Sequence, residues 1–199
     1  ALDMWLLGQP LTVVLDDHLP LDPASYQPEF ANIGEDGALW GPIFEKAAAK
    51  YLGTYEAVNA GGGAHGIEVM TGAPSSTLEH EKTDLEEVWN QLEKTLKEGG
   101  MITSGSYSPD GLGDTDSNQD GLPYNHAFTV INTHELNAWW GNVRLLEVRN
   151  PWGSETWKGE WSDKSENWDL DASLREQVGA YEKDDGRFFM SIEDFHKQM

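Results

Sequence analysis

The stretch Asn125–Val130 (NHAFTV) places a histidine at the start of a short apolar strand, behind a long polar loop over residues 104–124. The next long strand expected, residues 143–149, ends in Arg149–Gly153 (RNPWG). Taken alone, a histidine at a strand start is most often structural, and an asparagine before proline is most often a turn residue. Together they place an imidazole and an amide at the ends of two strands that we expect to be neighbours.

Cysteine hydrolases need this arrangement of side chains. An imidazole pairs with a thiol to give a thiolate and an imidazolium, and an amide oxygen holds the ring in one orientation. The imidazolium then protonates the leaving amine. The pairing of the two motifs is therefore more specific than either motif alone.

Two main helices and several strands are expected around this pair. Residues 39–52 carry apolar side chains at helical spacing, with Gly53 at the position of a C-terminal cap. Residues 83–98 form a second amphipathic helix, with a capping-box pattern at Thr83 and Glu86. Strands are expected at residues 11–15, 101–106, 127–132, 143–149 and 187–190, with a last short helix from Ser191. This order predicts an α+β fold with an antiparallel sheet.

A domain boundary is expected where turn residues gather. Residues 60–66 form a glycine-rich crossing, and Thr71–Ser76 (TGAPSS) is the best candidate boundary. We therefore expect a first domain over residues 1–72 and a second over residues 73–199.

Composition excludes several classes of function. The 199 residues include 13 Lys and Arg against 35 Asp and Glu, a net charge of −22. Such a chain repels phosphate backbones and anionic membrane surfaces, so neither a nucleic acid nor a membrane is an expected partner. No apolar run approaches the ~20 residues that span a bilayer. With no cysteine, these residues hold no disulfide, no thiolate zinc site and no cysteine nucleophile.

Spaced matches to one protein family extend over nearly the whole chain. They include the runs 13–20, 39–57, 126–130 and 149–153, followed by Trp157, Gly159, Trp161–Asp163, Trp168, Asp185–Gly186, Phe188 and Asp194–Phe195. In these residues the sequence resembles the calpain-type cysteine proteases. The resemblance implies a papain-like cysteine protease fold. Residues 1–72 would be the later part of the first lobe. Residues 73–199 would be the second lobe, a mainly antiparallel sheet or barrel with flanking helices that carries the His and Asn.

The resemblance also implies a role for each site residue. His126 would be the general base and acid, Asn150 would orient it, and Trp152 would shield their hydrogen bond. Gly61 would offer backbone hydrogen bonds to an extended peptide or protein substrate, where a residue without Cβ is physically sensible. Asn125 replaces a glycine that contributes to the substrate cleft in the family. A cytoplasmic setting is implied as well.

The catalytic cysteine of the family lies upstream of the segment that matches Ala1. We therefore expect a fragment of an intracellular cysteine endopeptidase that depends on an upstream lobe for its thiol and is inactive alone. The alternative is a non-catalytic calpain-like regulatory or scaffolding module whose parent also lacks the cysteine. A cysteine-bearing upstream segment in the parent would favour the enzyme.

No cofactor is expected to be required, and calcium is doubtful. Calpain cores bind one calcium ion per lobe. At the second-lobe site Asp163, Asp185 and the carbonyl of Lys183 match ligand positions, whereas Thr156 and Arg187 stand where carboxylates belong. Because calcium takes six to eight oxygens and several negative charges, we expect weak binding or none there.

A second calcium candidate is the loop Asp114–Gly121 (DTDSNQDG), which resembles the first half of an EF-hand loop. Asp116, Asn118 and Asp120 fall at ligand positions, but the twelfth position is Ala127 and no exiting helix follows. The alternative is an ordinary solvated loop rich in turn-forming residues.

The pair Trp139-Trp140 flanks a turn at Gly141-Asn142. It is more typical of hairpin packing or an exposed patch than of a cofactor site.

Overall fold

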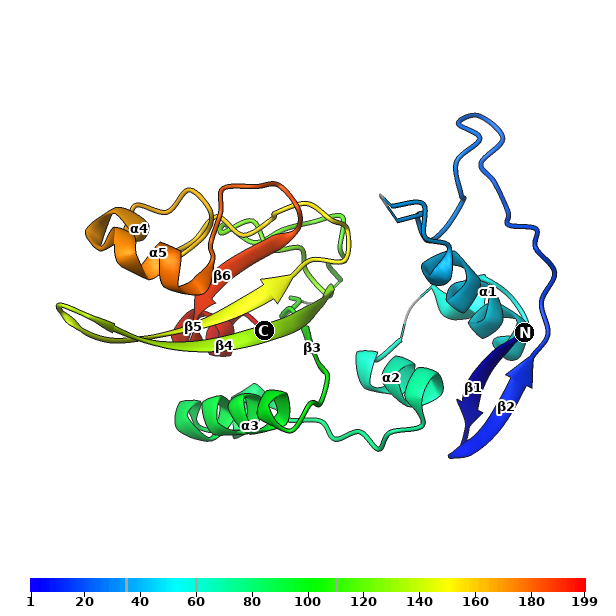
Figure 1. Ribbon diagram of the computed structural model, residues 1–199, viewed down its shortest axis with the longest axis horizontal. Helices are drawn as coiled ribbons and strands as arrows, with labels where there is room; N and C mark the ends of the chain where they lie inside the picture. Colours follow the sequence, from blue (N-terminus) through cyan, green and yellow to red (C-terminus); the bar gives the residue numbers. More distant parts are fainter. Residues whose placement is uncertain (35, 60, 110) are drawn as a thin grey trace. The chain divides into compact units, whose positions relative to one another are not determined.

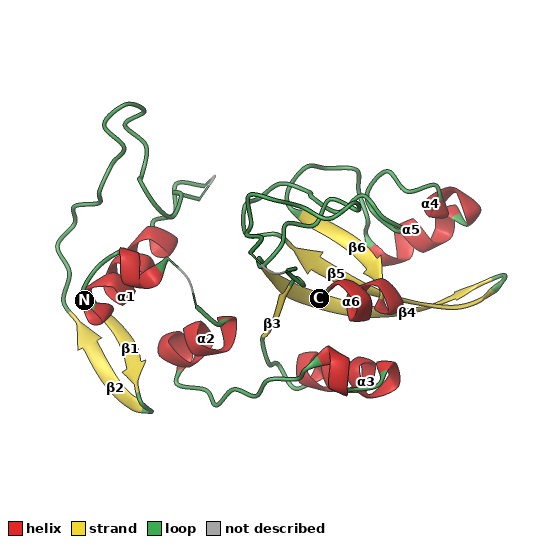
Figure 2. Cartoon of the chain, turned by 180° about the vertical axis from the view of Figure 1, so that it is seen from behind, coloured by secondary structure: helices red, strands yellow, loops and turns green. Residues whose placement is uncertain are grey.

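The computed structural model describes residues 1–34, 36–59, 61–109 and 111–199 (Figures 1 and 2). The chain divides into two compact units, residues 1–76 and 77–199, each described here by itself. The division follows Ser76, whereas the sequence pattern placed a boundary after residue 72. That the units correspond to two protease lobes stays a prediction. In the described parts of the chain, no helix combines the length and apolar character that a membrane span needs.

The first unit contains a β-hairpin and two α-helices. Its elements are β1 (Leu2–Leu6), β2 (Gln9–Val13), α1 (Trp40–Leu52), the 3-10 turn η1 (Glu56–Val58) and α2 (Gly63–Thr71). The helix expected over residues 39–52 is confirmed, and Gly53 caps it at φ 105°. The sequence reading of residues 60–66 as a crossing was wrong from Gly63 onward, because α2 begins there; Ala60 lies outside the described residues. Gly72 ends α2 in the left-handed region, and a Cβ there would stand 2.3 Å from the Trp5 ring.

The second unit is built on a four-stranded antiparallel sheet in the order β3-β4-β5-β6. Its elements are η2 (His80–Lys82), α3 (Leu85–Lys97), β3 (Ile102–Gly105), β4 (Ala127–Ala138), β5 (Gly141–Arg149), α4 (Asn167–Leu170), α5 (Ala172–Val178), β6 (Arg187–Ser191) and α6 (Ile192–Gln198). Helices together with antiparallel strands confirm the predicted α+β class.

Both faces of this sheet are covered by apolar side chains. Leu146 and Val148 of β5 face a core shared with α3 and α6, whereas Leu145 faces a second core shared with α5 and the buried Trp168. Because successive side chains of a strand point to opposite faces, a strand covered on both sides has consecutive apolar residues. Figure 1 shows α3 on one side of the sheet and α4 with α5 on the other.

Side-chain hydrogen bonds at the N-termini of α3 and α6 show which residue caps each helix. Asp84, not Thr83, caps α3: its carboxylate accepts from the Glu87 N–H at 2.9 Å. The Thr83 hydroxyl donates instead to the Glu79 carbonyl, so the box expected at Thr83 was wrong by one residue. Ser191 caps α6, so the last short helix begins where the sequence pattern placed it.

A charged ladder of His134, Glu147 and Arg187, of which Glu147 is the buried member, joins the three strands β4, β5 and β6. Glu147 is 6% exposed and lies 3.4 Å from His134 Nε2, while Arg187 Nε donates to it at 2.8 Å. Burial by itself raises the pKa of Glu147. The hydrogen bond from His134 and the charge of Arg187 outweigh that effect and hold the pKa below its ordinary value.

Replacing Glu147 with glutamine should lower the free energy of unfolding by about 1–3 kcal/mol at pH 7. The expected loss is smaller than for a fully buried ion pair, because the Arg187 side chain is partly exposed to solvent. A carboxylate with a lowered pKa stabilises the fold above its unfolded-state pKa, and this contribution is lost as pH falls through the folded-state pKa. The difference between variant and parent, measured by urea unfolding, should therefore shrink below about pH 4. Glu135→Gln, on the exposed side of β4, is the control; an equal effect in both variants would contradict the ladder.

Candidate active site

The β4–β5 pair brings His126 and Asn150 together. His126 directly precedes β4 and Asn150 directly follows β5, and Thr129 pairs with Arg149 across the two antiparallel strands. The start of one strand therefore lies beside the end of the other. His126 Nε2 is 2.9 Å from Asn150 Oδ1, with the two residues 8% and 0% exposed. The sequence expectation that these strands are neighbours is confirmed.

The contacts of Asn150 determine which ring nitrogen carries the proton. The backbone N–H of Trp152 donates to Asn150 Oδ1 at 3.0 Å, which identifies this atom as the acceptor. Asn150 Nδ2 points to Thr156 Oγ1 at 3.4 Å. Because Oδ1 only accepts, His126 Nε2 is the donor, and Nδ1 keeps the lone pair of the neutral ring. The arrangement leaves Nδ1 as the atom that can take a proton.

Two residues that the sequence did not single out for the site hold the backbone of the pair. Ser106 Oγ accepts from His126 N at 3.0 Å and donates to the Pro123 carbonyl at 2.6 Å. The Gly186 carbonyl accepts from Asn150 N at 2.8 Å, and a Cβ on Gly186 would stand 2.7 Å from the Asn150 carbonyl oxygen. The available sequence signal was position, because Ser106 directly follows β3, the strand beside β4, and Gly186 directly precedes β6.

Two aromatic rings contact the imidazole of His126. Phe128 meets it edge-on with centroids 4.9 Å apart, and Trp152 lies at 4.2 Å with a tilt of 44°. Phe128 is buried, whereas Trp152 is 51% exposed. Trp152 thus lies between the imidazole and solvent on one side, a position compatible with a shielding role.

The two candidate substrate-binding residues lie in different units. Asn125 is exposed, adjoins His126 in the chain and has φ 48°, in the left-handed region that glycine adopts without strain. Gly61 belongs to the first unit, is exposed and lies just before α2. A Cβ on Gly61 would meet nothing within 4 Å. Of these two residues, only Asn125 has a backbone conformation that restricts the choice of side chain.

The residues matching a calcium site contact one another and other protein groups. Asp163 Oδ2 accepts from Lys183 N at 3.0 Å, and the Lys183 carbonyl accepts from Asp185 N at 2.8 Å. Asp185 Oδ1 accepts from Arg187 N at 3.0 Å, while the Arg187 guanidinium pairs with Glu147. Within the described ranges, no group of three or more His, Cys, Asp and Glu side chains could hold a metal ion. These residues do not fit a shell of six to eight oxygens.

The carboxyl groups of Asp163 and Glu155 are partly buried. Burial raises the pKa of Asp163 above its ordinary value, although the Lys183 N–H opposes the change. Burial likewise raises the pKa of Glu155, whose carboxylate accepts from Asp163 N at 2.9 Å. Arg175 donates to the Asp163 carbonyl and so places a positive charge beside it.

Side-chain hydrogen bonds join the acidic loop 114–121 to the last helix, α6. Asn118 Oδ1 accepts from the backbone N–H groups of Asp120 and Leu122, both at 3.0 Å. Gln198 of α6 bonds Asn118 Nδ2 at 2.9 Å and Asp120 Oδ2 at 3.1 Å, while Asp116 is exposed. These are the contacts of an Asx turn. They show an ordered turn joined to α6, and the calcium loop and the ordinary loop both stay predictions.

The comparisons with known proteins cover the whole chain. A family model described as "Calpain family cysteine protease" matches residues 1–199. Calpain-12 and calpain-9 of Mus musculus are 32% and 33% identical over 192 and 195 residues, each covering 96% of this chain. The calpain-1 catalytic subunit of Bos taurus is 32% identical over 197 residues, 98% of this chain. The aligned regions are 26%, 27% and 27% of those relatives, so the chain spans about a quarter of their length.

The positive φ of Asn125 predicts how substitutions at this position change the stability of the fold. Asn125→Gly should leave stability nearly unchanged, whereas Asn125→Ala should cost about 1–2 kcal/mol. Glycine adopts the left-handed region freely and asparagine tolerates it through its short polar side chain, while alanine has a Cβ and no such side chain. Urea unfolding of the two variants measures the difference. Equal stability of both would contradict the strained backbone.

The hydrogen bonds of Asn150 predict the tautomer of His126. In ¹⁵N spectra of the neutral ring, Nε2 should have the shift of a protonated nitrogen and Nδ1 that of an unprotonated one. Asn150→Ala should mix the two tautomers, while Asn167→Ala, which alters an amide elsewhere in the unit, should not. A native ring protonated on Nδ1 would contradict the assignment.

Proposed function

Since the chain belongs to the calpain family of cysteine proteases, we propose that it supplies the general base and the orienting amide of a cysteine endopeptidase active site. The observation that supports the proposal most directly is the buried 2.9 Å contact between His126 Nε2 and Asn150 Oδ1. The substrates proposed are peptides or proteins in extended conformation, and Asn125 and Gly61 are each proposed to contact them.

In the proposed reaction, His126 Nδ1 takes the proton of a thiol, giving a thiolate and an imidazolium. The thiolate attacks the peptide carbonyl, and the imidazolium returns its proton to the leaving amine as the C–N bond breaks. The same nitrogen then deprotonates the water that hydrolyses the acyl-enzyme. Throughout, Asn150 holds Nε2–H and so directs Nδ1, and Trp152 shields the hydrogen bond.

The thiol of this proposal comes from a segment outside the given sequence, because these 199 residues contain no cysteine. We place it in the earlier part of the first lobe, of which residues 1–72 would be the later part. The 199 residues alone then form no acyl-enzyme and cleave no peptide.

The proposal gives calcium no role at Asp163, Lys183 and Asp185. Their oxygens accept hydrogen bonds from neighbouring backbone N–H groups, and Arg187 adds positive charge nearby. We further place the protein in the cytoplasm, a setting in which a chain without disulfides is ordinary.

A thiol-directed peptide epoxide tests the proposal on the full-length product of the same coding sequence. Ring opening forms an S–C bond and breaks a C–O bond, and the oxygen takes the imidazolium proton, so labelling reports the thiolate–imidazolium pair. Labelling should slow by about 100-fold or more in His126→Ala, the range usual for a lost general acid–base. His18→Ala, an exposed histidine, is the matched control.

The same assay separates the rival interpretations. Equal labelling rates in His126→Ala and the parent would contradict the assigned base. No labelling of a folded full-length product would favour the non-catalytic regulatory or scaffolding module. Asp163→Asn should leave any calcium dependence of labelling unchanged, since no metal role is proposed for that carboxylate.

A further inference from the structure

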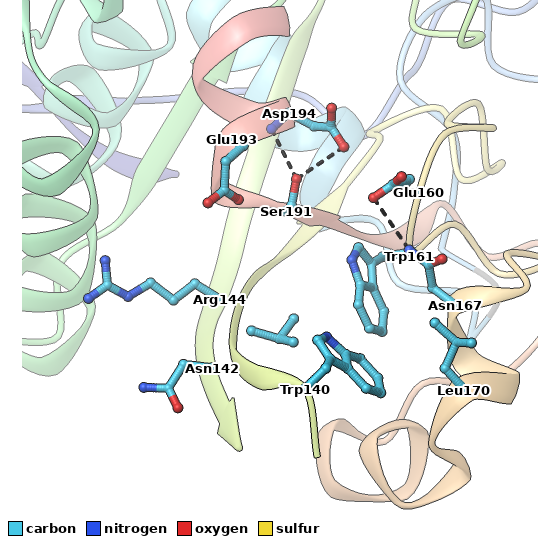
Figure 3. A pocket seen from close by; sticks show the side chains of 11 residues that line it. Trp140, Asn142, Arg144, Glu160, Trp161, Asn167, Leu170, Ser191, Glu193 and Asp194 are labelled. Carbon is cyan, nitrogen blue, oxygen red and sulfur yellow. Dashed lines mark hydrogen bonds between the residues drawn. The ribbon is translucent and has the colours of Figure 1, made fainter. Parts of the chain in front are cut away.

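An open pocket of about 450 Å³, which we call the cavity, lies in the second unit (Figure 3). It adjoins the turn between β4 and β5, whereas the His126–Asn150 pair lies at the other end of these two strands. It is lined by the turn between β4 and β5, by β5, by residues 160–161, by α4 and by the start of α6. The volume falls in the range of ordinary ligand sites. None of the residues assigned to the proposed protease chemistry lines it.

Two indoles and a leucine form its apolar wall. Figure 3 shows Trp140, Trp161 and Leu170 gathered around the same space. Trp161 is 5% exposed and is held edge-on against the buried Trp168 at 4.9 Å, so this part of the wall is pre-formed. Trp140 and Leu170 are 39% and 57% exposed, which leaves their apolar surface accessible.

The polar part of the lining comprises the carboxylates Glu160, Glu193 and Asp194 together with Asn142, Asn167 and Ser191. Glu160 accepts from Asn167 Nδ2 at 3.4 Å, and Asp194 accepts from Ser191 Oγ at 3.0 Å. Among the described residues that line the cavity, Arg144 is the one guanidinium. It donates to Glu86 at 2.6 Å and to Glu135 at 3.4 Å, which are not lining residues. Figure 3 shows its head group directed away from the tryptophans. The positive charge of Arg144 is thus compensated elsewhere, and the cavity keeps a negative character.

We propose that this cavity binds a lysine or arginine side chain presented by a partner protein. Indole faces and Leu170 suit the methylene stem and the cation, and carboxylates suit the charged head. The net charge of −22 attracts basic segments toward the surface. The neighbouring Trp139 is 79% exposed and offers apolar contact area beyond the cavity, which favours a protein over a small cation.

A short lysine peptide is the probe, compared with peptides in which norleucine or acetyl-lysine replaces the lysine. Binding is followed through the indole N–H signals of assigned tryptophans in ¹⁵N spectra of this chain. The lysine peptide should shift the Trp140 and Trp161 signals. Trp140→Ala should weaken its binding by about fivefold or more, as loss of a cation–π contact implies. The double variant Glu160→Gln/Glu193→Gln should weaken it as well.

Matched controls make the proposal falsifiable. Trp139→Ala removes the adjacent exposed indole that does not line the cavity, and it should weaken binding less than Trp140→Ala. Glu98→Gln, just after α3, removes one negative charge, as each substitution in the Glu160→Gln/Glu193→Gln variant does. It should leave the affinity for the lysine peptide unchanged. Equal binding of the norleucine peptide, equal loss in both tryptophan variants, or no shift at millimolar lysine peptide would each overturn the proposal. None of these outcomes depends on protease activity.

Discussion

The antiparallel pairing of β4 with β5 determines where both members of the candidate site lie. His126 opens one strand and Asn150 follows the other, so the register between Thr129 and Arg149 sets their separation. The outer strands secure the same end of the sheet, since Ser106 follows β3 and Gly186 precedes β6. A slip of one residue would turn side chains to the opposite face and separate the pair.

Arg187 connects the charged ladder to the site without touching the imidazole. The residue follows Gly186, whose carbonyl holds Asn150, and its guanidinium pairs with Glu147 on the neighbouring strand. The position that the family resemblance identifies with a calcium carboxylate is thus used here for a cross-strand ion pair. That this exchange weakens calcium binding stays a prediction.

Local patterns were enough to predict the α+β class, the two main helices and the strands that carry His126 and Asn150. Features that depend on register or distant packing were not predictable in this way. Ser106 is 20 residues from His126 in sequence, and only the β3–β4 pairing brings them together. The helix from Gly63 was missed because glycine disfavours helices locally, while packing against β1 and Trp5 is a tertiary effect. The sequence pattern singled out Trp140 as part of a hairpin or an exposed patch, but its place beside Trp161 in one cavity depends on distant packing.

The proposed chemistry assigns different physical demands to different polypeptide segments. The base and its amide must be rigid. In the second unit both lie buried at strand ends, and Asn150 Oδ1 accepts two hydrogen bonds, from His126 Nε2 and from Trp152 N. The nucleophile must then be brought to His126 Nδ1 within near-attack distance, where an error of about 1 Å costs ~100-fold in rate. Because the base is already oriented within its own unit, the alignment of the thiol-bearing segment becomes the step that contacts outside this unit must control.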